Sequence, residues 1–353
     1  MTEGGVFVYV SQHGSEQISA LRMSVETGEL TAIQTVAVTG KVMPMAVSPD
    51  SRFLYAALRS SPLWAVASLA IDRDNGTLTL LGTTPAFDSI VYLSTDRTGR
   101  FLFAANNPHH ADRAGSLTVN AIGQQGFVQA PYEVFRTPPK LHAALADPSN
   151  RFVFATSCDG DAIVRYPFDA ATGLLGPDPM PPVLVEGGRG PRHLQFHPNN
   201  RFLYLVNEYD ASVCVFGYDM GSGNLSEIQI VSAQPPGYVP GERRGRGISA
   251  AAADLHFTPD GRWLYVSVRG SLTMAAFLVD PATGRLTSAG HFPMPKEPRG
   301  FSIDPFGRYL FAAGDASNNL ISYSIDPGSG ALTRIAEYPM GDGPNWVECV
   351  RLP

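Results

Sequence analysis

The stretch GPRHLQFHPNNRFLYLVNE, residues 190–208, holds arginines, histidines and a glutamate on an otherwise apolar strand pattern. A glutamate held among arginines stays ionised and can act as a base, and a histidine titrates near neutrality, so it can carry a proton. Whether Arg192 and Glu208 do chemistry or merely belong to a structural repeat depends on what other copies of the pattern hold at the same positions.

A turn, an arginine and an apolar-aromatic strand recur along the chain, as in SPDSRFLYAAL from residue 48 and HPNNRFLYLVN from residue 197. Pro-Asp-Gly, as in TPDGRWLYVSV from residue 258, and Pro-Asn-Asn favour turns, and the Phe-Leu-Tyr runs favour strands. A spacing of roughly 50 residues suits a four-stranded propeller blade. The arginines that mark the repeats, which we interpret as structural, are Arg52, Arg100, Arg151, Arg201, Arg262 and Arg308.

The two ends of the chain supply one further blade. The N-terminal GGVFVYVSQHGSEQIS resembles GRYLFAAGDASNNLIS at 307–322, and GPNWVECV at 343–350 resembles the inner strand in EPRGFSID at 297–304. Joined, they close the ring without an open sheet edge. We therefore predict an all-β fold, a seven-bladed β-propeller with four-stranded blades, a closing blade shared between the N- and C-termini, and a single domain over residues 1–353.

In a propeller, the place of a residue within its repeat predicts where that residue lies in the blade. The inner strand begins, and the second strand ends, at one mouth of the central channel. The positions nine residues before each marking arginine hold Met43, Val91, His142, Arg192, Ala253 and Arg299, with Asn345 from the closure. The next positions hold Pro44, Tyr92, Ala143, His193, Asp254, Gly300 and Trp346. Seven residues after each arginine stand Arg59, Asn107, Cys158, Glu208, Arg269 and Asp315, with His13 by alignment.

The last set is unusual because it is mostly polar or ionisable, where a purely structural ring would carry small or turn-forming residues. The mouth is predicted to gather the cations Arg59, Lys140, Arg192, Arg269 and Arg299 opposite His13, His142, Glu208, Asp254 and Asp315. Clustered cations at a narrow mouth concentrate anions. The phase therefore predicts a site for a small anionic molecule, with Arg192 and Glu208 in it and Arg201 outside it.

Other polar residues have structural interpretations. We expect His197 to belong to its turn and His256 to pack or bridge blades, while Tyr92 and Trp346 fill the ring or shape the mouth. His109 and His110 resemble a metal pair, but adjacent histidines on a strand point in opposite directions. No metal or organic cofactor is predicted. The insertion at 232–250, which includes Arg243, Arg244 and Arg246, is expected on the mouth side as a mobile rim or lid.

Composition limits the classes of partner. The chain has 353 residues and a formal net charge of −6, without a long basic run, which argues against nucleic-acid binding. No apolar run has the length of a membrane span, and the start lacks the pattern of a signal peptide. Cys158, Cys214 and Cys349 are too few and scattered for a disulfide framework. We expect a cytoplasmic protein, monomeric or dimeric.

The chain resembles the seven-bladed lactonase propellers, a family that includes bacterial 6-phosphogluconolactonase and the fungal carboxymuconate lactonising enzyme. The resemblance runs from end to end, and its most specific motifs include VMPMAVSPDSRFLY at 42–55, ADLHFTPDGRWLYVSVR at 253–269 and GPNWV at 343–347. It implies a functional set of His142 in KLHAA, Arg192 in GPRH, Glu208 in VNE and Arg269 in SVRG.

The resemblance implies hydrolysis of an anionic sugar-acid lactone. Glu208 or His142 would activate water, and Arg192 and Arg269 would stabilise the oxyanion. We expect the substrate-binding residues to be Arg59, Arg299, His193, Asp254, His13 and Asn107. No GxSxG motif is present, so direct attack by water is preferred over an acyl-enzyme.

Two alternatives remain at this point. The same acid and base could move a proton beside a carboxylate while a ring opens or closes, which is the cycloisomerase chemistry of the muconate type. A non-catalytic propeller could instead act as an interaction scaffold. Scaffold propellers carry recurring GH and WD signatures, which do not recur here, and the ionisable residues collect at the axis instead of the rim.

Overall fold

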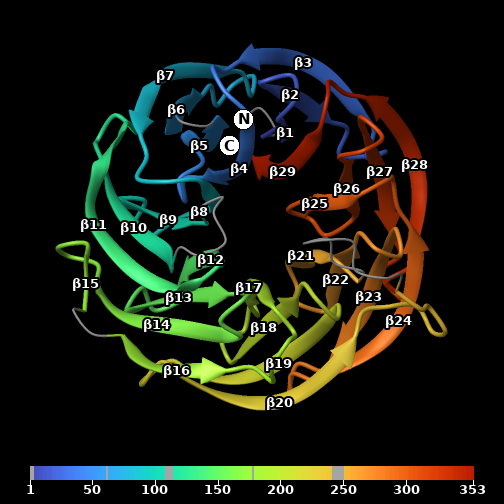
Figure 1. Ribbon diagram of the computed structural model, residues 1–353. Helices are drawn as coiled ribbons and strands as arrows, with labels where there is room; N and C mark the ends of the chain where they lie inside the picture. Colours follow the sequence, from blue (N-terminus) through green and yellow to red (C-terminus); the bar gives the residue numbers. More distant parts are fainter. Residues whose placement is uncertain (1–3, 61–62, 108–113, 177–178, 241–249) are drawn as a thin grey trace.

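The computed structural model describes residues 4–60, 63–107, 114–176, 179–240 and 250–353. Across these ranges the chain forms strands and turns without a helix, so no described segment is a helix that could cross a membrane. The strands form seven sheets arranged in a ring (Figure 1). The predicted seven-bladed β-propeller is confirmed.

The strands fall into four classes by their distance from the ring centre. The inner strands are β4 (Val42–Val47), β8 (Ile90–Thr95), β12 (Leu141–Ala146), β17 (Pro191–Phe196), β21 (Ala252–Phe257), β25 (Pro298–Ile303) and β29 (Pro344–Arg351). The second strands are β1 (Val6–Gln12), β5 (Phe53–Ser60), β9 (Phe101–Asn106), β13 (Phe152–Ser157), β18 (Phe202–Asn207), β22 (Trp263–Val268) and β26 (Tyr309–Gly314).

The two remaining classes complete the blades towards the rim. The third strands are β2 (Gln17–Met23), β6 (Leu63–Ile71), β10 (Ala114–Ile122), β14 (Ala162–Asp169), β19 (Ser212–Asp219), β23 (Thr273–Val279) and β27 (Asn319–Ile325). The outer strands are β3 (Leu30–Ala37), β7 (Leu78–Pro85), β11 (Val128–Pro139), β16 (Met180–Leu184), β20 (Asn224–Ser232), β24 (Leu286–Pro293) and β28 (Leu332–Pro339), and the short β15 (Leu174–Leu175) pairs with β14 as β16 does.

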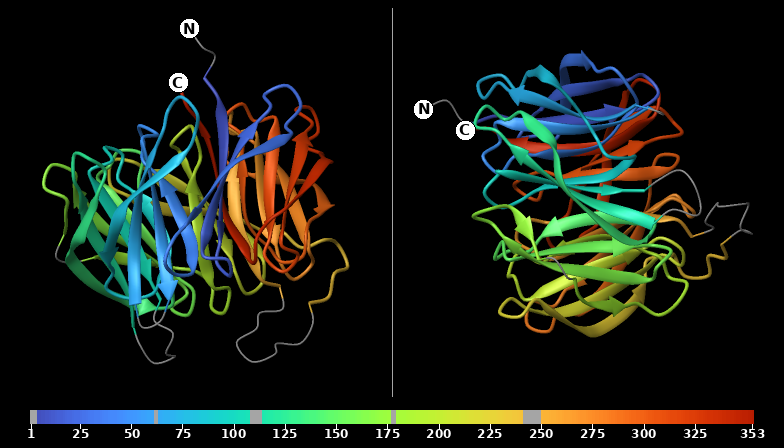
Figure 2. Two further views of the ribbon diagram at one scale, coloured as in Figure 1. Left: turned by 90° about the horizontal axis from the view of Figure 1, so that it is seen from above. Right: turned by 60° about the vertical axis from the view of Figure 1, so that its left-hand side comes forward.

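The closing blade joins the two ends of the chain, as predicted. β1 pairs antiparallel with β29, with Val10 opposite Val347, and the sheet order is β29-β1-β2-β3. Beyond the strands, the amide of Leu352 donates to the carbonyl of Gly5 over 2.9 Å. The ends of β1 and β29 accordingly lie side by side in all views (Figures 1 and 2). No sheet edge is left open at this point of the ring.

The turns between inner and second strands follow one plan. The Arg201 guanidinium lies 5.3 Å from the centre of the Phe202 ring, and it donates to the carbonyl of Ala282 in the next blade over 3.2 Å. Phe202 in turn packs on Gly284, which has φ +75° and leaves no room for a Cβ. The same aromatic-on-glycine contact occurs between every pair of neighbouring blades: Phe7–Gly76, Phe53–Gly126, Phe101–Gly173, Phe152–Gly223, Phe202–Gly284, Trp263–Gly330 and Tyr309–Gly28.

Polar groups cap these turns. Asp304 accepts hydrogen bonds from the amides of Arg308 and Tyr309 at 2.6 Å each. His197 takes the equivalent place in its own turn, where Nδ1 accepts from the amide of Asn199 over 3.1 Å and Nε2 lies 2.9 Å from the carbonyl of Gly261. His197 is therefore structural, as its sequence position predicts.

Burial is greatest in the second strands and falls towards the rim. The second strands β9, β18, β22 and β26 are buried at every residue, whereas most residues of the outer strand β3 are exposed. Inner strands run away from the mouth and second strands return to it. This direction places the first residues of the inner strands and the residues after the second strands at one end of the ring.

Candidate functional site

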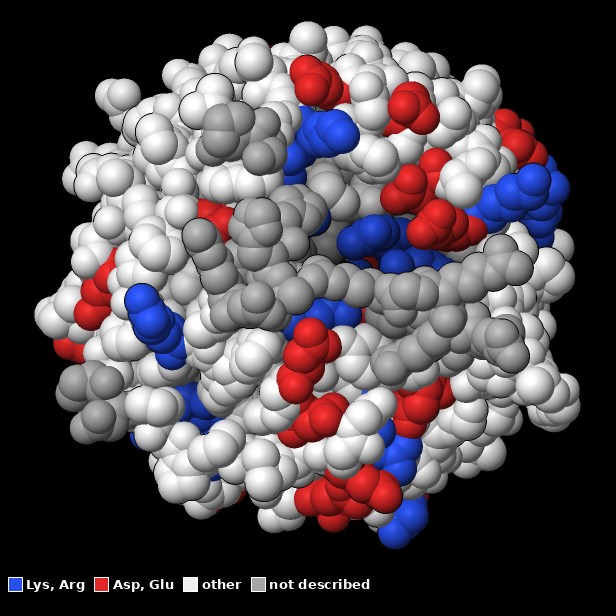
Figure 3. Space-filling view, viewed as in Figure 1, with Lys and Arg blue, Asp and Glu red and all other residues white. Residues whose placement is uncertain are grey.

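Lys and Arg side chains gather around the hollow at the centre of one face of the ring (Figure 3). Repeat phase predicts the residues on this face, which we call the mouth. His142 and Arg192 begin inner strands, and Glu208 and Arg269 directly follow second strands. Because both kinds of position lie at the same end of each blade, neighbouring blades bring these side chains together.

Glu208 is the centre of the mouth's charge network. Its Oε1 lies 3.0 Å from Arg269 Nη2, and its Oε2 lies 3.4 Å from Lys140 Nζ and 3.8 Å from Arg192 Nε. Burial by itself would raise the pKa of Glu208, but the charges of the three cations outweigh it and lower that pKa to about 2. The carboxylate is therefore ionised, and it holds the cations around it in place.

Arg192 is buried although it carries a charge. Its Nη1 donates to the carbonyl of Ala253 and lies 3.1 Å and 3.4 Å from Nε2 and Nδ1 of His193. Because this nitrogen is close to both ring nitrogens, it rests against the face of the imidazole, not at one lone pair. Burial lowers the pKa of Arg192 to about 9, so the guanidinium remains charged at neutral pH.

His142 has an imidazole nitrogen that no described residue satisfies. Its Nδ1 is buried and has no hydrogen-bond partner among the described residues. Its ring lies 5.2 Å from that of His193. Burial, followed by the charge of Arg192, keeps the pKa of His142 well below its usual value. The ring is neutral and can accept a proton.

His193 and Asp254, both predicted to bind substrate, are buried and bound to each other. His193 Nδ1 lies 2.8 Å from Asp254 Oδ1, and His256 Nε2 lies 3.1 Å from the other carboxylate oxygen. Burial and the charge of Arg192 lower the pKa of His193 to about 4, so Nδ1 donates its hydrogen to the carboxylate. His256 also packs on Phe301 of the next blade, as predicted, with ring centres 4.8 Å apart.

An aromatic group surrounds the His193 ring. Tyr92 and Trp346 lie 5.0 Å and 5.7 Å from it, centre to centre. Trp346 Nε1 donates to Glu348 over 2.7 Å, and burial raises the pKa of Glu348 to about 7. The sequence reasoning missed Glu348. It stands two residues after Trp346 on β29 and thus on the same strand face, a signal that strand alternation carries.

The opposite part of the mouth holds Arg59, Arg299 and Asp315. Asp315 Oδ1 lies 3.1 Å from His13 Nε2, and Oδ2 accepts from Asn345 over 2.9 Å. Burial alone would raise the pKa of Asp315, but these hydrogen bonds lower it. His13 thus meets the carboxylate of the neighbouring blade.

Asn107 directly follows β9, also at the mouth end. The backbone amide of Asn107 donates to the carbonyl of Ser89 over 2.9 Å, and the hydroxyl of the same serine accepts from Arg59 Nε over 2.9 Å. Asn107 therefore shares a supporting residue with Arg59.

Several other residues that the sequence analysis names lie outside the described residues or apart from the charge network. His109, His110, Arg243, Arg244 and Arg246 lie outside the described residues. Within the described ranges, no group of three or more His, Cys, Asp or Glu is arranged to hold a metal ion. Cys158, Cys214 and Cys349 are free. The outer strand β20 precedes the insertion at 232–250 and the inner strand β21 follows it, and residues 241–249 of the insertion lie outside the described residues.

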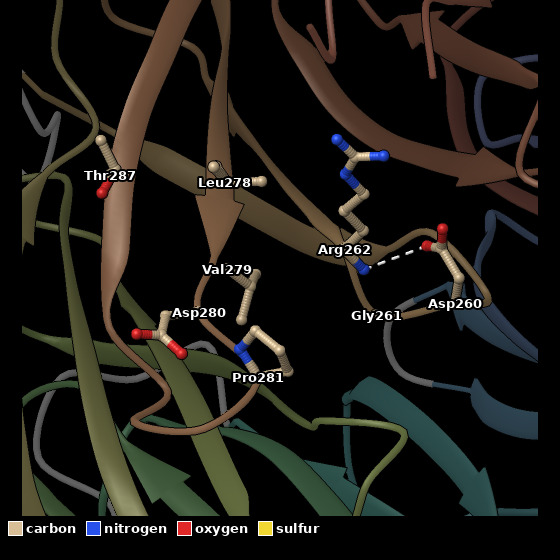
Figure 4. A pocket seen from close by; sticks show the side chains of 8 residues that line it. All are labelled: Asp260, Gly261, Arg262, Leu278, Val279, Asp280, Pro281 and Thr287. Atoms are coloured by element: carbon tan, nitrogen blue, oxygen red, sulfur yellow. Dashed lines mark hydrogen bonds between the residues drawn. The ribbon is translucent and has the colours of Figure 1, made fainter. Parts of the chain in front are cut away.

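A cavity of about 550 Å³ lies among the structural turns (Figure 4). The turn residues Asp260, Gly261 and Arg262 line it together with β23 and the turn at Asp280. Asp260 accepts a hydrogen bond from the amide of Arg262 over 3.0 Å. These turns lie at the end of the blade away from the mouth, so this cavity is separate from the charge network.

The family model "Lactonase, 7-bladed beta-propeller" matches residues 6–349. This chain belongs to the lactonase family of seven-bladed β-propellers. The 6-phosphogluconolactonases of Pectobacterium carotovorum and Yersinia pestis are 38% and 36% identical to it over 297 residues, 84% of this chain and 84% of each relative.

Solved structures agree with the fold of this lactonase. A putative 6-phosphogluconolactonase from Bacteroides uniformis superposes with a TM-score of 0.87 at 29% identity, over 98% of this chain and 100% of that one. A periplasmic gluconolactonase from Pseudomonas aeruginosa gives a TM-score of 0.87 at 25% identity, over 99% and 100%. These relatives favour an enzyme that hydrolyses a lactone ester over a cycloisomerase or a scaffold.

Proposed function

We propose that this lactonase hydrolyses the lactone of a phosphorylated sugar acid at the mouth. The proposal depends on one observation: Arg192, Arg269 and Lys140 all form ion pairs with Glu208. Beside them lies the neutral His142, whose buried Nδ1 has no hydrogen-bond partner among the described residues. The names of the relatives support the substrate class. The mouth offers a base for water, cations for the developing charge, and further cations for an acidic group on the substrate.

His142 is the better placed of the two candidate bases. Both oxygens of Glu208 are engaged by cations, and a carboxylate with a pKa of about 2 takes up protons weakly. His142 is not engaged by a cation, and its buried Nδ1 has no hydrogen-bond partner among the described residues. In the proposed reaction, water attacks the carbonyl carbon while the imidazole takes its proton, and the same proton then passes to the ring oxygen as the C–O bond breaks. The imidazole is neutral again at the end.

Arg192 and Arg269 would stabilise the oxyanion of the tetrahedral intermediate. Preorganised cations act strongly in a site with little water, because they need no rearrangement as the charge develops. The carbonyls of Ala253 and Ala251 and the carboxylate of Glu208 hold these guanidinium groups in place. Asp254 would hold the His193 ring in place, and Arg192 would rest against that ring. In this proposal His193 and Asp254 position Arg192, whereas the sequence predicts that they bind the substrate themselves.

Turnover of 6-phosphoglucono-δ-lactone by His142→Asn and Glu208→Gln tests the proposal. We expect His142→Asn to lower kcat by about 10²–10⁴-fold, the usual worth of a general base. Glu208→Gln should lower kcat less than His142→Asn does, because it loosens the cations that stabilise the oxyanion but leaves the base in place. A large loss of kcat in Glu208→Gln with normal kcat in His142→Asn would transfer the base role to Glu208. Normal turnover in both variants would contradict the mechanism.

A further inference from the structure

Two arginines at the mouth have no acidic partner among the residues that the structure describes. Arg59 Nε donates to the hydroxyl of Ser89 over 2.9 Å, and Nη1 lies 3.2 Å from the sulfur of Met43. Among the described residues, no carboxylate lies within ion-pair distance of the Arg59 or Arg299 guanidinium. Both side chains are partly covered by protein. They differ in this from Arg192 and Arg269, which share Glu208.

The two guanidinium groups also repel each other. Arg59 and Arg299 belong to the blades on either side of the closing blade. Burial and, to a smaller extent, the charge of Arg299 together lower the pKa of Arg59 to about 10. Covering two like charges costs free energy. The carboxylates Asp315, Glu208 and Glu297 offset part of this cost for Arg299 from beyond ion-pair distance, yet burial and the charge of Arg269 still lower the pKa of Arg299. The folded protein therefore gains stability from any anion that joins them.

Two of the carboxylates that act electrostatically on Arg299, Asp315 and Glu208, are engaged by other residues. The two oxygens of Asp315 are engaged by His13 and Asn345 at 3.1 Å and 2.9 Å. Glu208 is likewise engaged by Arg269 and Lys140. The described residues thus leave Arg59 and Arg299 open to a ligand from outside.

We propose that Arg59 and Arg299 together bind the phosphate group of the substrate and thereby select a phosphorylated lactone over an unphosphorylated one. A phosphate carries about −1.5 to −2 charges at neutral pH, which matches two guanidinium groups better than one carboxylate does. Arginine forks also fit phosphate oxygens in pairs. This inference rests on the proposed function.

The two ends of the substrate would then occupy different parts of the mouth. The charge of Arg299 also contributes to lowering the pKa of Arg192 and of His142, so it lies within electrostatic reach of the reacting groups. A lactone whose carbonyl lies at Arg192 can therefore place its phosphate at Arg299 and Arg59. The reaction is carried out in one part, and the substrate is recognised in the other.

The test compares kcat/KM for 6-phosphoglucono-δ-lactone with kcat/KM for glucono-δ-lactone. The ratio of the two is measured in the wild type, Arg59→Met, Arg299→Met and the control Arg201→Met, whose arginine lies in a structural turn. Each mouth variant should lower the ratio by about 10- to 100-fold, the usual worth of hydrogen bonds to a charged group. Arg201→Met should keep the wild-type ratio. A ratio does not depend on how much of the protein is folded.

The outcomes separate this inference from the function on which it rests. If the wild type turns over neither lactone, the proposed function is wrong. If the wild type is active but Arg59→Met and Arg299→Met reduce both substrates equally, the phosphate subsite is wrong and the lactonase proposal stands. A ratio near one in the wild type would also overturn the subsite.

Discussion

Arg192 and Arg201 stand on the same β-hairpin and serve opposite ends of the propeller. Arg201 belongs to a turn in which arginine lies on an aromatic ring and the ring packs on a glycine of the next blade, a contact found between all neighbouring blades. Arg192 belongs to a layer whose residue types vary from blade to blade, namely Met43, Val91, His142, Arg192, Ala253, Arg299 and Asn345. The turns are uniform and the mouth is varied.

The difference follows from what each end must do. Each turn solves the same packing problem, because every blade meets its neighbour at the same angle, and one set of residues suffices. A single ligand at the axis meets each blade differently, so the residues around it cannot be equivalent. In a repeat protein, departure from the repeat therefore points to a binding or catalytic role, and adherence to it points to folding.

The largest effect is expected from breaking the closure. Removal of residues 343–353 deletes β29, the inner strand that pairs with β1, and exposes the edge of the closing blade. We propose that the chain is a single domain, so this deletion should abolish cooperative unfolding of the whole protein, as seen in thermal melts followed by circular dichroism. A truncated chain that melts like the full-length protein would contradict the shared closure.

A smaller loss is expected from one structural turn. Gly284 has φ +75°, and a Cβ there would come within 2.6 Å of the Phe202 ring. Gly284→Ala should lower the free energy of unfolding by about 1–3 kcal/mol, the range for strained backbone positions. Because the turn is away from the mouth, kcat/KM should not change. Chemical denaturation and lactone assays measure the two quantities.

The control for this variant is Gly187→Ala. A Cβ at Gly187 meets no atom within 4 Å, so the free energy of unfolding should change by less than about 0.5 kcal/mol. Equal stability of the two variants would argue against the aromatic-on-glycine contact as a structural requirement.

Much of the fold could be predicted because the repeat is periodic in the sequence. The regular spacing of the arginines from Arg52 to Arg308 predicts the number and length of the blades. The similarity of 343–350 to 297–304 predicts that the two ends of the chain share one blade. The blade of strands β12 to β16 departs from the regular plan. Its outer edge is divided between β15 and the short β16, in a proline-rich segment where amide donors are missing.

The site could be predicted in position but less well in role. Phase brought His142, Arg192, Glu208 and Arg269 to one end, because strand direction fixes where a residue lies. It could not reveal that Asp254 is bound to two histidines, or that Arg59 and Arg299 form no ion pair with a described carboxylate. Such pairings depend on side-chain directions between blades far apart in sequence, which a period along the chain does not encode.

The shift in Tm caused by inorganic phosphate tests most directly whether the mouth binds an anion while the turns only support the fold. At a phosphate concentration of about ten times its Kd, binding should stabilise the wild type by about 1.4 kcal/mol. Arg201→Met should have a lower Tm without phosphate, yet show the same shift when phosphate is added. Arg299→Met should lose most of the shift. Equal shifts in all three proteins, or a shift lost in Arg201→Met but kept in Arg299→Met, would contradict this division between the two ends.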